Sequence, residues 1–528
     1  MLAVIFVGFA LHRIWEFCKR FRTPLKRFDG PEADSWLWGN SLKIIGPQSS
    51  EDEWIQAYGR TYVTPVMFGK LRLNTTDPRA VAHVLAHVDN WPKPEPVREL
   101  LGSVTGEGLF IAEGETHKRQ RRIMNPSFSS GQLRELNSIF FETANQLRDV
   151  LDSILTGGRA EQEIDMFNFA GRASLDIIGL AGFGYRFNAL DDERNELFTA
   201  LNELVQAMSR APLMSLLRNR MKWLRYIPTK THRVMKASLE SVNRIGMELV
   251  LARKEEVQQD IQGATVSRSK IVGKDLLSSL VRANMAQNLP ISHRLSDKEV
   301  LAQISTFVVA GHETSAVSLS WTLLALAEHQ EVQHQLRNEL SLVAEEAPSM
   351  DELNALPYLD MVVKESLRFR PPVPLTTRIA VHDDEIPLSR PVADRYGVPH
   401  DSIQVQAGDF FGIEIRAMNR SKELWGEDAD DFRPERWNEE LAGARAIPGP
   451  YAHILTFLGG PRACIGYKFS IMELKSLLFT LIRSFEFAPV PGKKIGTQWV
   501  IVDRPIVKGE ERKGLQLPLI VKRTSKEI

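Results

Sequence analysis

The sequence predicts a mainly α-helical fold with a small β region. Five long stretches place apolar residues at the three- and four-residue spacing of amphipathic helices. These stretches are residues 133–155, 197–208, 234–257, 295–327 and 332–346. Short extended runs occur at residues 62–68 and 410–415, and again near the C-terminal end at 498–502 and 515–521. Helices therefore form most of the predicted fold, and strands form a minor part of it.

The composition is that of an ordinary globular protein, with 43% hydrophobic and 25% charged residues among 528. A net charge of +0 gives no overall attraction to nucleic acid. The two cysteines, Cys18 and Cys464, are far apart, which argues against a disulfide framework and for a reducing compartment. The most polar interval, 258–275, is expected to be a surface loop.

Since no linker-like segment divides the chain, we expect one large domain over residues 29–528.

Residues 1–28 are expected to form a membrane anchor and a basic linker. Residues 2–11 are continuously apolar, and six basic residues follow between Arg13 and Arg27. Ten apolar residues are fewer than the roughly 20 that span a bilayer, but the run can extend to Phe17 if Arg13 reaches the headgroups. A cleaved signal peptide is the alternative, although no basic residue precedes the run and no small-residue cleavage pattern follows it. Because the charges follow the run, the body is expected on the cytoplasmic side.

A second basic and apolar stretch covers residues 211–233 and contains no acidic residue. Such a stretch can lie in a membrane interface, or it can be a helix connection that packs on the body of the protein. The sequence leaves both interpretations open.

A glycine-rich segment near the C-terminal end points to a specific cofactor. It reads Phe457-Leu-Gly-Gly460-Pro-Arg462-Ala-Cys464-Ile-Gly466. Its glycines allow the backbone to turn tightly and to approach a flat or bulky group. Apolar residues recur at helical spacing after Cys464, and a helix N-terminus favours a thiolate. A single stabilised thiolate is a soft ligand suited to haem iron. A buried structural cysteine is the alternative.

Four strings, in this order, resemble the signatures of the cytochrome P450 enzymes. They are Ala310-Gly-His-Glu-Thr314, the E-x-x-R of Glu365–Arg368, the P-E-R region Phe432–Trp437, and F-x-x-G-x-R-x-C-x-G at 457–466. Each short string is weak alone, but four in the family's order make coincidence a poor explanation. The resemblance implies the cytochrome P450 fold, a helical prism with a small β region beside it.

The resemblance implies haem b as the cofactor, with Cys464 as the axial thiolate ligand and Phe457 packed beside the sulfur. Gly460 and Gly466 belong to the same binding loop. Four basic residues match family positions that meet the haem propionates, although a solvated surface charge is the alternative for each arginine. They are Arg462, Arg378, Arg121 and His117, the last in place of the family's usual tryptophan.

The E-x-x-R string places Glu365 and Arg368 on one face of a helix. The resemblance adds Arg436 to this pair in a charge network with a structural role. Because buried ions must be paired, we expect Glu365→Ala to lose haem incorporation.

In the family, the helix that carries Ala310, Gly311, Glu313 and Thr314 activates oxygen. Gly311 is expected to leave room over the cofactor, and Thr314 to loosen the helix and hold a water or oxygen. Glu313 would deliver protons, since an acid–alcohol pair suits oxygen cleavage at an apolar site. The alternative for Thr314 is a hydroxyl bonded to its own helix backbone. A zinc-protease motif fails, because Ala316 stands where H-E-x-x-H needs its second histidine.

The resemblance implies a monooxygenase in the endoplasmic reticulum membrane that inserts one atom of O2 into a lipophilic small molecule. The sequence shows no flavin or nicotinamide domain, so electrons are expected from a separate NADPH–cytochrome P450 reductase. Candidates for the reductase-docking face are Lys118, Arg119, Arg122 and Lys468, with ordinary surface charge as the alternative. The amino-acid sequence of residues 117–126 resembles that of fungal members of the family. This resemblance suggests a role in secondary (terpenoid) metabolism or xenobiotic oxidation.

Two other functions remain as alternatives. One is a haem-thiolate isomerase or dehydratase that uses no O2, against which the Glu313–Thr314 pair argues. The other is a haem sensor or electron carrier without turnover, against which an expected apolar pocket argues.

Overall fold

The computed structural model describes residues 23–45, 51–156, 161–192, 194–210, 229–261, 275–285 and 294–524. The chain forms two compact units, neither of which is a continuous stretch of sequence. The first unit comprises Met1–Pro94, Val373–Asp431 and Glu440–Cys464, and the second comprises Glu95–Pro372, Phe432–Glu439 and Ile465–Ile528. The chain thus passes between the units several times, and no single linker joins them. This agrees with the absence of a linker-like segment from the sequence.

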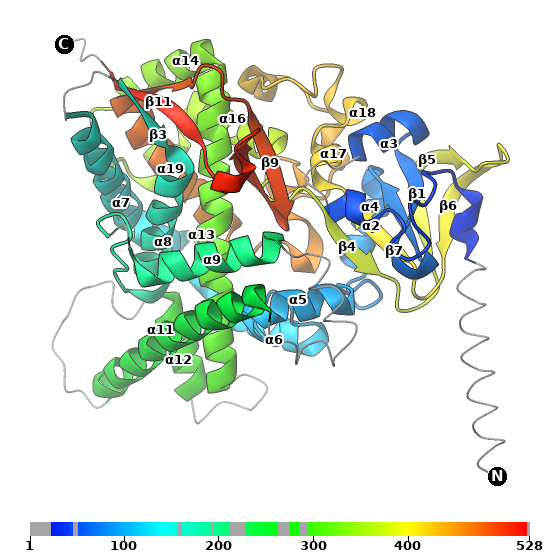
Figure 1. Ribbon diagram of the computed structural model, residues 1–528, viewed down its shortest axis with the longest axis horizontal. Coiled ribbons are helices and arrows are strands. Elements are labelled where there is room, and N and C mark those ends of the chain that lie inside the picture. Colours follow the sequence, from blue (N-terminus) through cyan, green and yellow to red (C-terminus); the bar gives the residue numbers. More distant parts are fainter. Residues whose placement is uncertain are drawn as a thin grey trace. The chain divides into compact units, whose positions relative to one another are not determined.

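The first unit contains most of the strands and only short helices (Figure 1). Its strands are β1 (Thr61–Pro65), β2 (Leu71–Thr75), β4 (Thr376–Ile379), β5 (Asp384–Ala393), β6 (Pro399–Val405) and β7 (Phe410–Ile413). Its α-helices are α2 (Ser41–Ile45), α3 (Glu51–Tyr58), α4 (Pro78–Ala86), α17 (Ile415–Asn419) and α18 (Lys422–Trp425). Short 3-10 helices are η1 (Pro24–Arg27), η2 (Met67–Gly69), η7 (Ala444–Ala446), η8 (Leu455–Phe457) and η9 (Gly460–Arg462).

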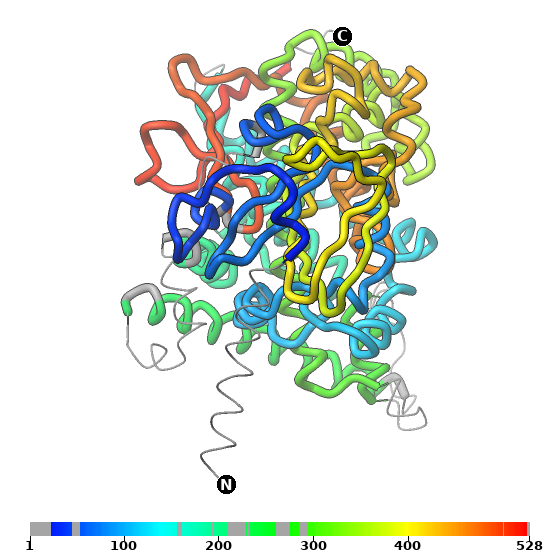
Figure 2. Tube along the Cα trace, turned by 90° about the vertical axis from the view of Figure 1, so that its right-hand side faces the viewer, coloured from blue at the N-terminus to red at the C-terminus, as the bar shows by residue number. Residues whose placement is uncertain are grey.

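A four-stranded sheet is the centre of the first unit, in the order β1-β2-β7-β4. Strands β2 and β7 are parallel, with Thr75 opposite Ile413, and the other neighbours are antiparallel. Tyr62, Leu73 and Phe411 are completely buried on this sheet. Strands β5 and β6 form a separate long hairpin, which Figure 2 shows in yellow.

The second unit contains the long helices predicted from apolar spacing. Its α-helices are α5 (Glu95–Thr105), α6 (Gly114–Met124), α7 (Ser130–Thr156), α8 (Met166–Phe183), α9 (Glu196–Arg210), α11 (Lys230–Ile261), α12 (Leu276–Met285), α13 (Asp297–Glu328), α14 (Gln330–Ser341), α15 (Met350–Asn354), α16 (Pro357–Phe369) and α19 (Tyr467–Ser484). Its 3-10 helices are η3 (Asn125–Phe128), η6 (Pro434–Asn438) and η10 (Glu511–Lys513). Its strands are β3 (Glu161–Asp165), β8 (Phe485–Pro489), β9 (Ile495–Val500), β10 (Val502–Val507) and β11 (Pro518–Arg523).

Helix α13 is the core helix of the second unit and packs against α8, α16, α19, β8 and β10 (Figure 1). It starts at a capping box in which Ser296 and Glu299 satisfy each other's backbone amides. Leu319, Leu323 and Leu326 are completely buried. Each contributes about 1.5–3 kcal/mol of hydrophobic stabilisation. Apolar residues occur on almost every side of this helix and not in a single stripe. This distribution explains why the helix lies inside the unit.

Three predicted segments end earlier than expected. The run 62–68 is a strand only to Pro65, because Phe68 has a φ of 60° and belongs to the 3-10 turn η2. The strand at 410–415 stops at Ile413, where α17 follows, and the helix at 332–346 stops at Ser341. In each case the hydrophobic pattern of the sequence continues beyond the last residue of the strand or helix, although the backbone changes direction there.

Some predictions fall outside the described residues. The predicted anchor and linker are described only from Thr23 onward, and most of the basic stretch 211–233 and of the polar interval 258–275 also falls outside. Among the residues that the structure describes, no helix combines the length and the apolar character needed to cross a bilayer.

Candidate active site

The loop that carries Cys464 ends the first unit. Cys464 is in no disulfide and is exposed, and its backbone amide donates to the carbonyl of Phe457 over 2.8 Å. Phe457 is buried, with its ring edge-on to Tyr451 at 6.1 Å between ring centroids. The helix that follows begins at Tyr467, after its N-cap Gly466. Cys464 therefore precedes the predicted helix N-terminus by a short turn.

Two glycines are required by the shape of this loop. Gly460 has a φ of +64°, and a Cβ there would lie 2.6 Å from the carbonyl oxygen of Leu85. A Cβ on Gly459 would lie 2.0 Å from the carbonyl oxygen of Pro448. The sequence also predicted a tight turn at Gly466. Its φ is −91°, however, and a Cβ there would make an ordinary contact at 3.7 Å with Phe128. Within the chain, neither backbone conformation nor packing requires glycine at position 466.

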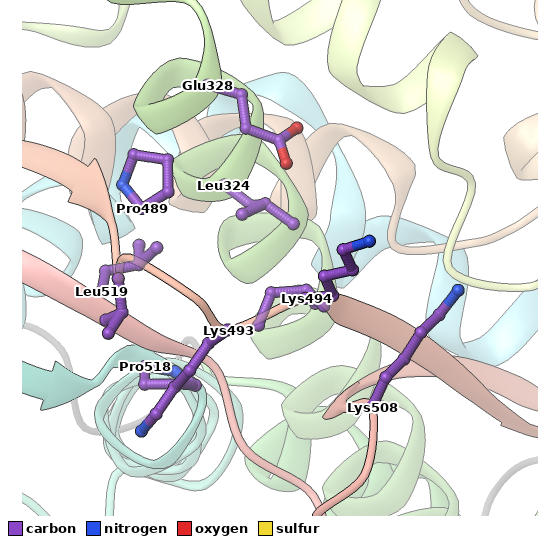
Figure 3. Close-up of a pocket in the computed structure, with 10 residues that line it drawn as sticks. Leu324, Glu328, Pro489, Lys493, Lys494, Lys508, Pro518 and Leu519 are labelled. Carbon is purple, nitrogen blue, oxygen red and sulfur yellow. The ribbon is translucent and has the colours of Figure 1, made fainter.

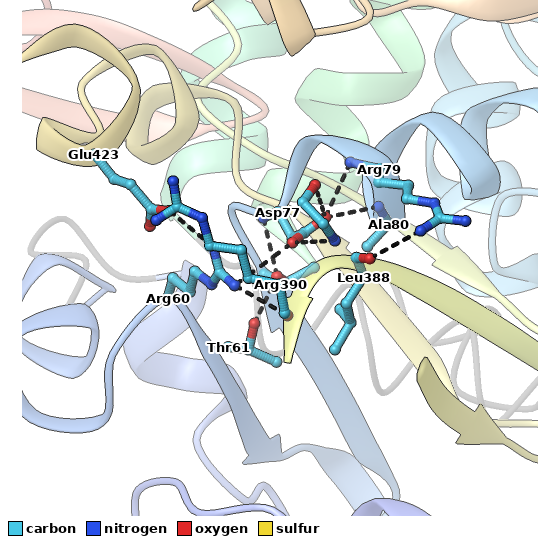
Figure 4. A network of polar contacts seen from close by, with 10 residues as sticks. Arg60, Thr61, Asp77, Arg79, Ala80, Leu388, Arg390 and Glu423 are labelled. Atoms are coloured by element: carbon cyan, nitrogen blue, oxygen red, sulfur yellow. Dashed lines mark hydrogen bonds and ion pairs between the residues drawn. The ribbon is translucent and has the colours of Figure 1, made fainter. Parts of the chain in front are cut away.

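Helix α4 provides the surface on which the cysteine loop rests, since Leu85 belongs to it. Asp77 caps this helix by accepting from the amides of Arg79 and Ala80 at 3.0 and 3.1 Å (Figure 4). Its second carboxylate oxygen accepts from the amide of Ser389 in β5 at 2.8 Å. These bonds tie the start of α4 to the β5–β6 hairpin.

Arg60 extends this cluster on the other side of Asp77. Its guanidinium lies 3.8 Å from Asp77 and 2.9 Å from Glu423 (Figure 4). The cluster therefore positions α4, and through α4 the loop that carries Cys464.

Arg378 in β4 is a buried cation without an acidic partner among the described residues. Its side chain is 3% exposed, and Nη1 donates to Thr376 Oγ1 and to the carbonyl of Thr377, both at 3.0 Å. Nη2 is buried and has no hydrogen-bond partner there. Burial lowers the pKa of Arg378 to about 10. A buried donor of this kind needs an acceptor, and an anionic ligand group is the acceptor that would also stabilise the charge.

The other predicted propionate partners lie in both units. Arg462 is half-buried in η9 of the first unit. Helix α6 of the second unit carries His117, which is 5% exposed, and the half-buried Arg121. The four-residue spacing puts His117 and Arg121 on one face of that helix.

The predicted oxygen-activating segment forms a partly exposed stripe on the otherwise buried α13. Val309, Ala310, Gly311, Glu313 and Thr314 are all half-buried, whereas the helix interior on either side of them is almost entirely buried. The stripe is a surface that a bound group can contact.

Two details of this segment correct the predictions. Helix α13 runs without a break from Asp297 to Glu328, so Thr314 does not loosen it. The Thr314 hydroxyl donates to the Ala310 carbonyl over 2.6 Å, which is the self-bonded arrangement that the sequence left as the alternative. A Cβ on Gly311 would lie 3.1 Å from Ile178 of α8, so the glycine permits close packing of the two helices.

Glu313 pairs with an arginine that the sequence had not linked to it. The Nε of Arg504, in β10, donates to the Glu313 carboxylate. The two side chains are 12% and 4% exposed, Glu313 first. This ion pair joins the predicted proton donor to the β9–β10 hairpin.

Two further titratable groups on or beside α13 had also been missed. His312 is 6% exposed, has no partner for Nε2 among the described residues, and lies edge-on to Phe198 at 5.9 Å. Burial lowers the pKa of His312 to about 4, while the charge of Glu313 acts in the opposite direction. Glu473 of α19 is 1% exposed and accepts from Ser315 over 2.5 Å. Burial raises the pKa of Glu473 to about 8.

The predicted charge network is present in the second unit. Glu365, Arg368 and Arg436 are completely buried. Arg368 donates to both oxygens of the Glu365 carboxylate at 2.9 and 2.8 Å, and Arg436 Nε donates at 2.9 Å. The same carboxylate accepts from the Arg433 amide at 2.9 Å and from Trp437 Nε1 at 3.2 Å. Five donors on one carboxylate hold the P-E-R segment against α16.

A pocket of about 300 Å³ lies elsewhere in the second unit (Figure 3). Leu324 and Leu519 contribute to its apolar wall, and Lys493, Lys494 and Lys508 contribute its basic side chains. Leu324 lies ten residues beyond Thr314 on α13, which is about 15 Å along a helix. The pocket is therefore separate from the stripe around Thr314.

Comparisons with known proteins agree with the motif resemblance. The family model described as Cytochrome P450 matches residues 30–499, across segments of both units. The chain is 44% identical to Cytochrome P450 monooxygenase 128 of Postia placenta, over 95% of this chain and 93% of that relative. It is 44% identical, with the same coverage, to Cytochrome P450 monooxygenase 205 of the same fungus. Cytochrome P450 monooxygenase claW of Ampulloclitocybe clavipes is 33% identical over 97% of this chain and 96% of that relative.

Proposed function

We propose a function from one premise: the chain belongs to the cytochrome P450 family and is a P450 monooxygenase. The family implies a haem iron with a cysteine thiolate ligand, O2, a redox partner and a small-molecule substrate. The proposal is that this enzyme oxidises a lipophilic small molecule with electrons from a separate NADPH–cytochrome P450 reductase. The observation that carries it is the exposed thiol of Cys464 in a loop that requires Gly459 and Gly460.

The residues present fit a haem b group. Cys464 offers an exposed thiol that is in no disulfide, and Arg378 offers a buried donor that calls for an anion, such as a propionate. Arg462, Arg121 and His117 are the further propionate partners of the proposal. When bound through a thiolate, haem supplies the activation of O2 and favours O–O cleavage.

Glu313 and Thr314 would supply the protons that this chemistry consumes. Thr314 donates its own hydroxyl proton to Ala310, so its oxygen lone pairs remain available to accept from a water. Glu313 lies next to it and is held by Arg504. Proton delivery by these two side chains would be general acid catalysis by positioned groups.

The Glu365 network has a structural part in the proposal. Its carboxylate pairs with Arg368 and Arg436 in the core of the second unit, so its loss would remove the charge that these two buried cations share. Removing one partner from such a buried pair costs about 3–5 kcal/mol.

The four basic candidates for docking the redox partner differ in exposure and in their contacts within the protein. Arg119 pairs with Glu299 and donates to the Arg294 carbonyl at 2.7 Å, which gives it a role inside the unit. Lys118 and Arg122 are exposed, although Lys118 also donates to Glu115 of the same helix at 2.8 Å, and Lys468 donates to Ser130 at 3.0 Å. We therefore propose Lys118 and Arg122 as the docking charges on α6, and not Arg119.

We propose attachment to the endoplasmic reticulum membrane, with the catalytic part in the cytosol. Support comes from the apolar start of the sequence and from exposed apolar side chains in the first unit. Trp36 is 76% exposed, Leu42 46% and Phe68 44%. The amide of Phe68 donates to the carbonyl of Leu37, so these segments are joined. Tryptophan at such a site suits the membrane interface.

The named relatives are fungal monooxygenases, and their names state no substrate. We propose oxidation of a terpenoid secondary metabolite or of a xenobiotic, which the fungal resemblance supports.

The test is consumption of NADPH and O2 by the purified holoenzyme with NADPH–cytochrome P450 reductase. The proposal expects consumption that requires both proteins and is stimulated by a lipophilic substrate. Turnover of a substrate without NADPH or O2 would instead indicate an isomerase or dehydratase. Substrate binding without any turnover would indicate a sensor.

A further inference from the structure

The pocket beside the C-terminal end of α13 combines apolar surface with exposed lysines. Pro489 is exposed, and Val490 and Ile495 are half-buried, so part of its apolar lining is open to solvent. Lys494 and Lys508 are exposed at the ends of β9 and β10. Figure 3 shows Pro489 and Lys508 on opposite sides of the view. A ligand in this pocket would therefore meet both apolar side chains and positive charge.

The two exposed lysines stand opposite each other where the β9–β10 hairpin opens. The antiparallel register pairs Val507 with Ile495. One residue further along, the amide of Lys508 donates to the Lys494 carbonyl at 2.9 Å. Side chains that stand opposite each other on antiparallel strands lie close together, and like charges there destabilise the pairing. In Figure 3 both lysine side chains extend in the same direction.

The charges around the pocket are compensated unevenly. Lys493 pairs with Glu163 of β3. In the described part of the chain, by contrast, Lys494 and Lys508 form no ion pair and no side-chain hydrogen bond. Glu328, which is exposed, is the acidic residue of the lining. One acid opposite two uncompensated lysines leaves an excess of positive charge, which favours a ligand with one negative charge.

Lys522 shows how the same unit compensates a lysine elsewhere in its sheets. It lies on β11, opposite Glu161 of β3 on one side and opposite Glu486 of β8 on the other. Opposite charges at facing positions stabilise a sheet. The pair at the end of the hairpin has the reverse arrangement, so an anion from solution would supply the charge that the neighbouring strand does not.

Gly496 gives room to the side chain of Lys508. A Cβ on Gly496 would lie 3.0 Å from both Cγ and Cε of Lys508. The aliphatic part of this lysine therefore lies across the glycine and covers the hairpin, while its ammonium group remains in solvent. Packing against the hairpin, and not an ion pair, thus sets the direction of the Lys508 charge.

We propose that this pocket binds a small organic anion that carries one carboxylate and a short apolar body. The carboxylate would lie with Lys494 and Lys508, and the apolar body would lie against Val490 and Ile495. A cavity of about 300 Å³ is at the small end of the range for ligand sites, so the body must be short. Because the pocket is separate from the stripe around Thr314, this binding goes beyond the proposed function and requires no turnover.

The experiment measures the binding of octanoate to the holoprotein by calorimetry. Acetate and 1-octanol are the comparison probes, since one has the charge without the long apolar body and the other has the body without the charge. Lys494→Gln, Lys508→Gln and the double variant K494Q/K508Q remove the positive charges. Gly496→Ala keeps both charges but displaces the Lys508 side chain. Lys522→Gln is the matched control, because it removes an exposed lysine of the same unit from outside the pocket.

Octanoate is expected to bind the wild type and Lys522→Gln equally, and acetate and 1-octanol to bind at least about 10-fold more weakly. Each single lysine variant should weaken octanoate binding by about 3- to 5-fold, since each charge is exposed, and the double variant by about 10-fold or more. Gly496→Ala should resemble Lys508→Gln. The binding that depends on the lysines should leave the haem absorption spectrum unchanged, whereas binding beside the haem would shift it.

Hydrogen exchange of residues 493–508 provides a second readout. Octanoate is expected to slow exchange there in the wild type and in Lys522→Gln, but not in K494Q/K508Q. The inference is overturned if K494Q/K508Q binds octanoate as tightly as the wild type, if acetate binds as tightly as octanoate, or if Lys522→Gln weakens binding as much as the lysine variants of the pocket. None of these measurements depends on NADPH oxidation, so failure of the inference and failure of the proposed function are separate results.

Discussion

Replacing Glu473 by glutamine is expected to change how the stability of the protein depends on pH. Glu473 is 1% exposed, and its pKa is raised to about 8, chiefly by burial and against the bond from Ser315. In the unfolded chain the same carboxyl has its ordinary pKa of 4.5. Between these values the folded protein binds one more proton than the unfolded chain. Stability therefore falls as pH rises through this window, by about 1.4 kcal/mol per pH unit.

His312 acts in the opposite direction at lower pH. Its pKa is lowered from 6.5 to about 4 by burial, so the unfolded chain binds the extra proton between these values. Stability from this group rises with pH there, by about 1.4 kcal/mol per unit. The two effects offset each other from about pH 4.5 to 6.5. Above that range Glu473 acts alone, and from pH 6.5 to 8 it lowers the free energy of unfolding by about 2 kcal/mol.

The assay is urea unfolding of the holoprotein at several pH values between about 5 and 8. We expect the wild type to be nearly flat at the acidic end and to lose stability above about pH 6.5. Glu473→Gln keeps the shape and the bond from Ser315, and its stability should instead rise with pH and then level off. Glu427→Gln is the control, because that side chain is 93% exposed. A Glu473→Gln variant with the wild-type loss of stability above pH 6.5 would refute the reasoning.

Four further predictions concern the site. Glu365→Ala strands two buried arginines and should lower the haem content of purified protein, at a stability cost of about 3–5 kcal/mol; a haem-to-protein ratio equal to that of the wild type would contradict this. Arg378→Gln removes a buried donor and should speed haem transfer to apomyoglobin, whereas an unchanged rate would separate Arg378 from the cofactor. Thr314→Ala should increase the share of NADPH electrons released as hydrogen peroxide, and an unchanged share would assign the hydroxyl to its helix alone. Gly460→Ala, at a φ of +64° and with Leu85 too close, should abolish haem loading, and normal loading would show that the loop tolerates a side chain.

The parts of the site that sequence predicted well are local in the chain. The loop before Cys464 could be interpreted because its glycines, its cysteine and the following helix lie within a few residues of one another. Glu365 and Arg368 are likewise three residues apart on one helix. Arg436 is 71 residues from Glu365 and was linked to it through family resemblance, not through any pattern of its own.

The parts that sequence missed depend on contacts between distant segments. Glu313 and Arg504 are separated by 191 residues, and nothing in either neighbourhood marks the other as its partner. The close approach of Gly311 to Ile178 depends on how α8 packs against α13, which the sequence around Gly311 does not show. Glu473 did carry a local signal, since it is an acid inside the apolar run Ile471-Met472-Glu473-Leu474, which indicates a buried carboxyl.

The central claim is that Cys464 is the thiolate ligand of a haem iron. The most direct test is the absorption spectrum of the reduced holoprotein with carbon monoxide, for the wild type, Cys464→Ser and the control Cys18→Ser. The account predicts the long-wavelength band of a thiolate-ligated haem in the wild type and in Cys18→Ser, and its loss in Cys464→Ser. Persistence of that band in Cys464→Ser, or its absence from a haem-loaded wild type, would contradict the claim.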